Sequence, residues 1–211
     1  MLGLSCPGLA DSVTVRKAIA VRLSARHAKL LFFCLMLAPL AQAQQLVLHC
    51  DPAQTAANFS LGASLHTVHG GFTLKRCEIH FDPSSASISG EVVFDATTGQ
   101  TDNDSRDRKM HKDVLESERY PEVRFRPDRV DGKVATAATS TVQVHGMFGI
   151  HGAEHEITVP VDVKLDGNHW TASARFPVPY VRWGMKNPSN IFLRVRDSVD
   201  VELKAAGTAS Q

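Results

Sequence analysis

The sequence lacks the extremes of composition that mark specialised classes of protein. It has four cysteines in 211 residues, too few for a scaffold held together by disulfides. Lys and Arg number 23 against 22 Asp and Glu, so the basic surplus that a nucleic-acid-binding protein needs is absent. With 43% apolar and 21% charged residues, the composition is that of an ordinary globular protein. It excludes a disordered chain, a collagen and a membrane protein with several spans.

The first 43 residues differ from the rest and indicate a secretory signal peptide. Basic residues precede the apolar run 30–40, which ends at the small-x-small sequence Ala41-Gln42-Ala43. This run of 11 residues is short for a membrane-spanning helix, which takes roughly 20 residues. We therefore predict a signal peptide over 1–43, cleavage near Ala43, and a single periplasmic or secreted domain over 44–211. An uncleaved anchor or a buried core helix is the alternative for this segment.

Removal of this segment changes the charge and the cysteine count. The remaining 168 residues carry 18 basic and 21 acidic residues, a net charge of −3. Cys6 and Cys34 leave with the segment, and Cys50 and Cys77 remain. Two thiols in an oxidising compartment tend to pair, so a Cys50–Cys77 disulfide is one prediction. Two buried, reduced cysteines that pack as small apolar residues are the other.

The rest of the chain is dominated by alternation of apolar and polar residues. In 157–165 the odd positions are apolar and the even positions mostly polar, which is typical of a half-buried strand. Pro160 lacks a backbone donor, so this strand should have an edge or a bulge there. Similar stripes occur within 92–94, 123–125, 142–150, 170–178 and 199–203.

Two segments depart from this pattern. Between Phe72 and Phe81 the apolar residues change phase, and a β-bulge near Lys75 and Arg76 would return them to one face. Residues 102–118 show no alternation and are rich in charge, but Met110 and Val114 lie four apart. We predict one short amphipathic helix there, capped by Asn103 or Asp104 and lying over one end of the sheet. A solvated loop is the alternative.

Together these patterns predict an all-β fold. About eight strands, each with one apolar face, favour an extended antiparallel β-barrel with one short helix capping one end. Closure into a barrel is favoured over an open sandwich because it removes the unpaired strand edges.

Several motifs in this order resemble the YceI-like family of lipocalin-like, polyisoprenoid-binding, extracytoplasmic proteins. They are Asp51-Pro52, Phe59, Thr67–Phe72, Phe81–Pro83, Ser105–Met110, Leu115–Ser117, Tyr120–Phe125 and Val144–Gly146. The resemblance covers nearly all of 46–206. It implies a lipocalin-like barrel with an apolar interior tunnel that binds or carries a long isoprenoid, quinone-like or fatty-amide-like chain.

The sequence also departs from the family pattern. Gln54-Thr55 stand where a His-Ser pair is usual, and Cys77 stands where a glycine is usual. The segment Tyr180–Ser189 suggests a subgroup with an extended loop before the last strands. These departures affect the identity of the ligand more than the fold.

The candidate ligand-binding residues follow from strand parity. Apolar side chains expected to face one interior are Phe59, Leu61, Phe72, Leu74, Val92, Phe94, Phe125, Val144, Phe148 and Phe176, with Met110 from the helix. Trp183 and Met185 are expected to form a lid or lip. The same stripes would also fill a closed core, so a packed structural or interaction barrel without ligand is an alternative.

Other chemistry finds weaker support in the sequence. His145, His151 and His155 cluster near a predicted hairpin turn, with Glu154 or Glu156 as a third metal ligand, so a metal-dependent extracytoplasmic enzyme is a second hypothesis. No nucleophile elbow or Cys-His arrangement is present. We expect a binding protein without catalytic residues, cofactor or resident metal, whose partner is an apolar lipid and not a nucleic acid. A homodimer and a transient membrane contact remain open.

Overall fold

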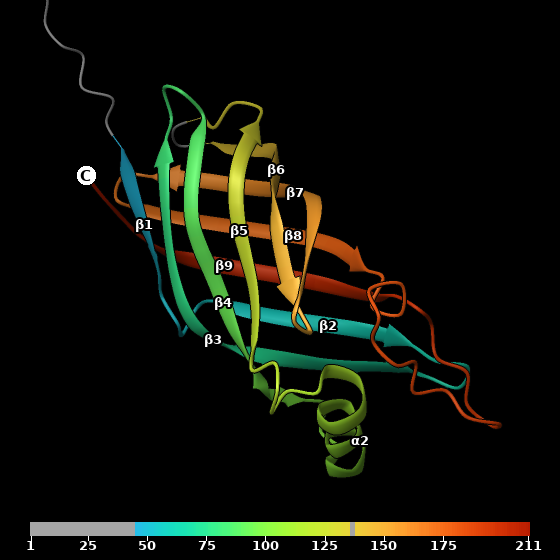
Figure 1. The fold of residues 1–211 in the computed structure, drawn as a ribbon. Coiled ribbons are helices and arrows are strands. Elements are labelled where there is room, and N and C mark those ends of the chain that lie inside the picture. Colours follow the sequence, from blue (N-terminus) through green and yellow to red (C-terminus); the bar gives the residue numbers. More distant parts are fainter. Residues whose placement is uncertain (1–44, 136–137) are drawn as a thin grey trace, which may run out of the picture. The chain divides into compact units, whose positions relative to one another are not determined.

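The computed structural model describes residues 45–135 and 138–211. The predicted signal peptide and its cleavage point near Ala43 lie outside these residues. The described residues form nine strands and one helical segment (Figure 1). The strands are β1 (Leu46–Cys50), β2 (Ala56–Gly62), β3 (Thr67–Asp82), β4 (Ser87–Gln100), β5 (Glu122–Asp131), β6 (Thr139–Ile150), β7 (Ala153–Asp166), β8 (His169–Val178) and β9 (Val199–Ser210). Within the described ranges no helix is long and apolar enough to span a membrane.

The strands close into an antiparallel barrel, as the alternation predicts. Neighbouring strands pair in the order β3-β2-β9-β8-β7-β6-β5-β4. The last strand in this order, β4, also pairs with β3, and this pairing closes the barrel. Strands β1 and β2 occupy a single position, because each pairs with β3 on one side and β9 on the other. The short break between them is a turn in which Asp51 Oδ1 accepts a hydrogen bond from the Ala53 amide at 2.9 Å. The described part of the barrel therefore has eight strand positions.

Two irregularities in the strand pairing lie at positions predicted from the sequence. The β3–β4 register shifts between Leu74 and Arg76, which confirms the predicted bulge. It lets Ile79 and Phe81 join Phe72 on the inward face despite the change of phase. At the other site, β7 pairs with β8 only from Val161 onward, so Pro160 lies where that pairing ends.

The predicted helix is present but shorter than 102–118. It comprises α2 (Asp104–Lys109), followed by a π-helical turn, η1 (Met110–Leu115). Asn103 is the N-cap, since its side chain accepts a hydrogen bond from the Arg106 amide at 2.9 Å. Glu116 has a left-handed backbone (φ 47°) and ends the helical segment.

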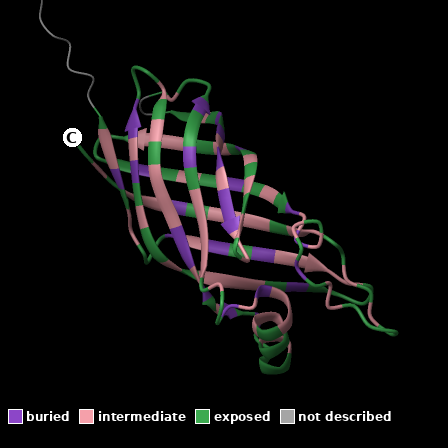
Figure 2. Ribbon diagram, viewed as in Figure 1, coloured by how far each residue is buried: buried purple, intermediate pink, exposed green. Residues whose placement is uncertain are grey.

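The interior of the barrel is divided into two clusters of apolar residues. One is packed around Leu48, Phe81, Val142 and Trp170, in the half that contains β1. The other, around Phe148, Val178 and Met185, includes side chains from the helix and from the segment after β8. Buried and more exposed positions alternate along the strands (Figure 2). The first half of the barrel is solid, and the second half contains the candidate site.

The Cys50–Cys77 disulfide is present and lies in the solid half. It joins β1 to β3, with 5.6 Å between the two Cα atoms, and both cysteines pack against the first cluster. The prediction of a paired rather than a reduced state is therefore confirmed.

Exchange of Asp82 for Asn is expected to make stability less sensitive to acid. Hydrogen bonds from Ser84 and Ser85 in the β3–β4 turn lower the pKa of Asp82 to about 2. A lowered carboxyl pKa stabilises the fold above the unfolded pKa of about 3.9, and this contribution is lost as the pH falls through the folded pKa. Urea unfolding between about pH 4 and pH 2 should show a smaller loss of stability for Asp82→Asn than for the wild type.

The control for this variant is Asp128→Asn, at an exposed carboxylate on β5. It should follow the wild-type pH profile. Equal acid sensitivity of Asp82→Asn and the wild type would show that the turn hydrogen bonds do not act through this carboxyl group.

An apolar cavity at one end of the barrel

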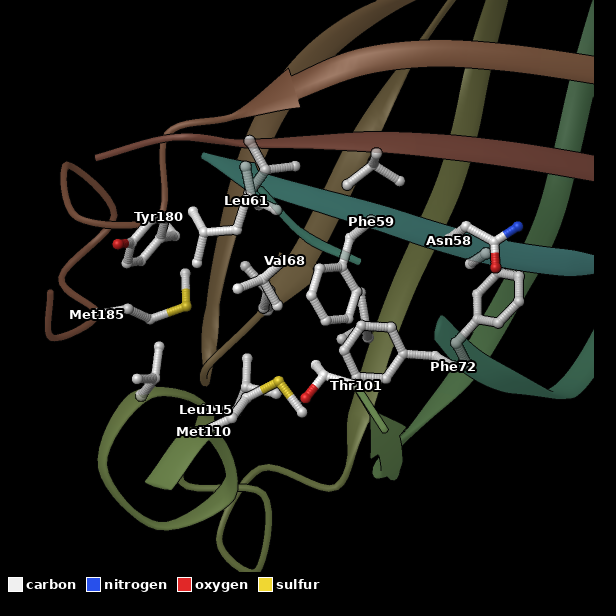
Figure 3. A pocket seen from close by; sticks show the side chains of 18 of the residues that line it. Asn58, Phe59, Leu61, Val68, Phe72, Thr101, Met110, Leu115, Tyr180 and Met185 are labelled. Carbon is white, nitrogen blue, oxygen red and sulfur yellow. The ribbon is translucent and has the colours of Figure 1, made fainter. Parts of the chain in front are cut away.

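The hollow half of the barrel encloses a cavity of about 490 Å³. Small-molecule pockets span about 300–1,000 Å³, so its size is that of a ligand site. Every strand except β1 contributes to its wall, together with the helical segment and the segment after β8. Figure 3 shows Phe59, Phe72, Met110 and Met185 converging on the cavity from these different elements. The lining is mainly apolar.

Most of the ligand-binding residues predicted from strand parity, the helix and the expected lid lie in this wall. They are Phe59, Leu61, Phe72, Val92, Phe94, Met110, Phe125, Phe148, Phe176 and Met185. Three others lie elsewhere. Val144 faces inward but packs in the solid half. Leu74 pairs with Phe94 of the wall but does not itself line the cavity. Trp183 lies outside the cavity wall, as described below.

The cavity wall also includes apolar residues that were not selected from the sequence. They are Ala57, Val68, Val114, Leu115, Val123, Ile150, Ile157, Val159, Val161, Ala174, Val178, Tyr180, Leu193, Val195, Val199, Val201 and Leu203. Alternation already placed Ile157, Val159 and Val201 on an apolar face, so parity could have identified them. Leu193 and Val195 lie in an irregular segment, where no periodicity points to the interior.

The inner end of the cavity, which we call its floor, is formed by residues that also pack in the solid half. Val92, Phe125 and Val161 line the cavity and also pack against the cluster around Trp170. The space therefore ends at packed side chains partway along the barrel. The open interior expected from the sequence is present as a cavity at one end of the barrel, and a continuous tunnel is not confirmed.

Two aromatic rings of the wall lie against glycines. The rings of Phe59 and Phe72 are 5.4 Å apart between centroids. A Cβ atom at Gly70 would collide with the Phe59 ring, and one at Gly99 would collide with Phe72 and come within 3.0 Å of Met110 Cε. The missing side chains leave room for the rings to lie close to the backbone, which keeps the centre of the cavity free.

The mouth of the cavity has a polar rim. One side is α2, with Asn103, Ser105 and Arg106; the other includes His66 and Asn190. Lys109 Nζ joins the two sides by donating a hydrogen bond to the Pro188 carbonyl at 3.1 Å. An apolar interior with polar groups at its entrance suits a molecule with a long apolar part and a polar end.

Hydrogen bonds at both ends fix the helical segment over the barrel. Arg106 donates to Thr101 through Nε (2.7 Å) and Nη2 (2.6 Å), and Thr101 in turn donates to Asp107. Arg106 and Asp107 thus cap the loop after β4. At the other end, His111 Nε2 donates to the Gly99 carbonyl at 2.8 Å, and Nδ1 forms a hydrogen bond with the Ser117 hydroxyl at 2.9 Å.

The segment 179–198 forms the remaining part of the wall. Tyr180 is buried and its hydroxyl donates to the Arg196 carbonyl at 2.8 Å. Burial, with a smaller effect of Asp197, raises the pKa of Tyr180 to about 12, so the hydroxyl stays a donor at neutral pH. The Met185 amide bonds to the Tyr180 carbonyl at 3.0 Å, which holds the Met185 side chain in the cavity wall.

Trp183 covers the side of the barrel instead of its mouth. In the described chain β8 residues 175–178 pair with β9 but not with β7, which leaves a gap in the β7–β8 pairing. Trp183 stacks on His155 of β7, with centroids 4.1 Å apart, beside this gap. It lines an outer cleft of about 630 Å³ that shares Ile157, Val159 and Phe176 with the main cavity. The Trp183 ring also packs against Phe148 of the cavity wall, with 5.7 Å between the ring centroids. Its role as a lid or lip stays a prediction.

The three histidines near the predicted hairpin turn have separate surroundings. His145 forms hydrogen bonds with Asp131 and Thr158, each at 2.7 Å. His151 packs against the Tyr120 ring, and His155 packs against Trp183. Among residues 45–135 and 138–211, no three His, Cys, Asp or Glu side chains are placed to hold a metal ion. The hypothesis of a metal-dependent enzyme thus finds no metal centre in the described part.

Comparisons with known proteins agree with this architecture. The YceI-like domain matches residues 48–206. BcnA of Burkholderia cenocepacia has a TM-score of 0.64 at 19% identity, covering 75% of this chain and 99% of its own. A polyisoprenoid binding domain from Saccharophagus degradans, implicated in plant cell wall breakdown, has a TM-score of 0.61 at 16% identity, with coverages of 78% and 98%. The Campylobacter jejuni YCEI protein has a TM-score of 0.55 at 15% identity, with coverages of 70% and 88%. No curated protein sequence matches the chain significantly.

Proposed function

Because the chain belongs to the YceI-like domain family, we propose that its cavity holds the apolar tail of a long-chain lipid outside the cytoplasm. The ligand class is an isoprenoid, quinone-like or fatty-amide-like chain, bound for sequestration or carriage. The observation that carries this proposal is the apolar cavity with a packed floor and a polar rim. Family membership and the fold shared with a polyisoprenoid binding domain support it.

The physical basis of binding is removal of the tail from water. Each buried methylene contributes about 0.8 kcal/mol, so ten to twelve buried carbons give on the order of 8–10 kcal/mol before costs. Ordering of the ligand and loss of its translation reduce this, which leaves low-micromolar to nanomolar affinity as the expected range. An apolar wall distinguishes one methylene from another weakly, so the polar rim would set the preference for a headgroup.

The extracytoplasmic location is part of the proposal. Its support is the basic and apolar sequence over 1–43 with Ala41-Gln42-Ala43 at its end, together with the disulfide of the barrel. N-terminal sequencing of the exported protein should find a start near residue 44. A mature chain that retains the apolar run 30–40 would contradict the predicted cleavage.

The test of the function is direct identification of the bound molecule. The full chain is expressed with export, purified without detergent, and extracted with organic solvent for mass spectrometry. We expect one class of long-chain lipid at near-stoichiometric amount. An extract equal to that of an exported control protein, together with no measurable binding of farnesol, ubiquinone or oleamide, would overturn the proposal.

A further inference from the structure

Three large apolar side chains of the described chain project into solvent, and all three lie near the cavity mouth. Leu65 is 80% exposed, Ile191 93% and Phe192 89%. Leu65 lies in the turn between β2 and β3, and the other two lie in the segment after β8. Single exposed apolar residues are ordinary, but a group of them beside a binding site indicates a contact surface.

The two loops are held side by side by backbone contacts. Ala63 forms a β-bridge with Val195, and the Ser64 amide donates to the Arg194 carbonyl at 2.9 Å. We call residues 63–66 and 190–195 together the apolar tip. It protrudes from the end of the barrel in Figure 1 and is mostly exposed in Figure 2.

A tight turn presents the two most exposed side chains outward. Asn190 Oδ1 accepts hydrogen bonds from the amides of Phe192 (2.9 Å) and Leu193 (2.8 Å), and the Asn190 amide donates to the Leu193 carbonyl at 2.9 Å. Leu193 lines the cavity, whereas Ile191 and Phe192 are left in solvent. The turn is therefore ordered, and the exposure does not come from a loop without internal bonds.

The apolar tip is continuous with the cavity wall. Ala63, His66 and Asn190 line the cavity, as does Val195. A molecule that leaves the mouth on this side meets the base of the tip first. Anything that binds the tip would thus be brought next to the entrance.

The charge around the apolar tip differs from that of the whole domain. Residues 182–196 contain Arg182, Lys186, Arg194 and Arg196 and no Asp or Glu, although residues 44–211 carry a net charge of −3. The next residue, Asp197, is also exposed and accepts a hydrogen bond from the Asn187 side chain at 2.7 Å. These four basic residues are all exposed. Exposed apolar side chains in the same segment as exposed basic groups are the combination that binds the surface of a membrane with anionic lipids.

We propose that the apolar tip docks on an anionic bilayer, with Leu65, Ile191 and Phe192 entering the headgroup region and the basic residues contacting lipid phosphates. The proposed function gives this docking its purpose, because a lipid tail could then pass between bilayer and cavity with little exposure to water. The docking itself requires only the tip.

The test is flotation of the full, exported chain with vesicles of two parts phosphatidylcholine to one part phosphatidylglycerol. Ile191→Ser/Phe192→Ser should lower the partition coefficient at least about tenfold, since two large side chains leave the membrane. Lys186→Gln/Arg194→Gln should lower it on these vesicles but not on pure phosphatidylcholine. The matched control Arg129→Gln/Lys133→Gln removes the same two charges at the opposite end of the barrel and should bind like the wild type.

Several results would overturn the docking. They are equal flotation of Ile191→Ser/Phe192→Ser and the wild type, failure of the wild type to float, or a wild-type dimer that this variant abolishes without any vesicle binding. The outcome is separable from that of the proposed function. A chain that carries lipid but does not float overturns the docking alone, and a chain that floats but never yields or binds a long-chain lipid overturns the carrier function alone.

Discussion

Replacement of Val201 by Trp is expected to weaken binding of a lipid tail about a hundredfold while the barrel still folds. Val201 of β9 faces the cavity between Phe59 of β2 and Phe176 of β8, its partners in the two neighbouring strands. Its side chain is only partly buried, so an indole can enter the cavity. Displacement of three to four methylenes at about 0.8 kcal/mol each removes about 3 kcal/mol, or roughly a factor of a hundred.

The effect can be measured by titration with a fluorescent fatty-chain probe and by the amount of lipid in organic extracts. The matched control is Thr171→Trp, which places the same ring at an exposed position on β8. It should bind like the wild type. Unchanged affinity of Val201→Trp, with an unchanged melting temperature, would show that the tail does not occupy this cavity.

Loss of the disulfide is expected to destabilise the fold by about 3–4 kcal/mol, which is the chain-entropy value for a loop of this length. The bridge spans 27 residues and joins β1 to β3. The double variant Cys50→Ser/Cys77→Ser should therefore melt on the order of 10 °C below the wild type. Because both cysteines pack against the solid half, affinity for the fatty-chain probe should change little at temperatures where the variant is folded.

Reduction supplies the control for this prediction. Dithiothreitol should lower the melting temperature of the wild type toward that of the double variant and leave the variant unchanged. Reactive Cys50 and Cys77 thiols in denaturant without reductant would show that the bridge is not formed.

Strand parity predicted the wall of the cavity wherever the strands are regular. Phe59 and Phe148 lie on strands whose alternation runs without interruption at these positions, and both line the cavity. Leu74 was selected by parity and pairs with Phe94 of the wall between two register shifts, but it does not line the cavity. Strand parity also indicates only whether a side chain points inward. It does not indicate how far along the barrel that side chain lies. Val144 is inward but belongs to the solid half.

The entrance to the cavity could not be derived from periodicity. Its rim combines α2 with residues of the irregular segment 179–198, and the Lys109–Pro188 contact joins positions far apart in the sequence. The helix itself was recognisable from Asn103 and the spacing of Met110 and Val114. Its end at Leu115 depends on the left-handed backbone of Glu116, a position for which the sequence offers no glycine.

The packed floor formed by Val92, Phe125 and Val161 limits the length of the apolar tail that the cavity can hold. A tail shorter than the hollow half leaves apolar surface uncovered, and a longer one must bend back or keep its remaining carbons at the rim. Entry and exit also share one opening, so the last part of the molecule to enter is the first to leave. Under the proposed function, an acceptor would therefore engage the headgroup before it receives the tail.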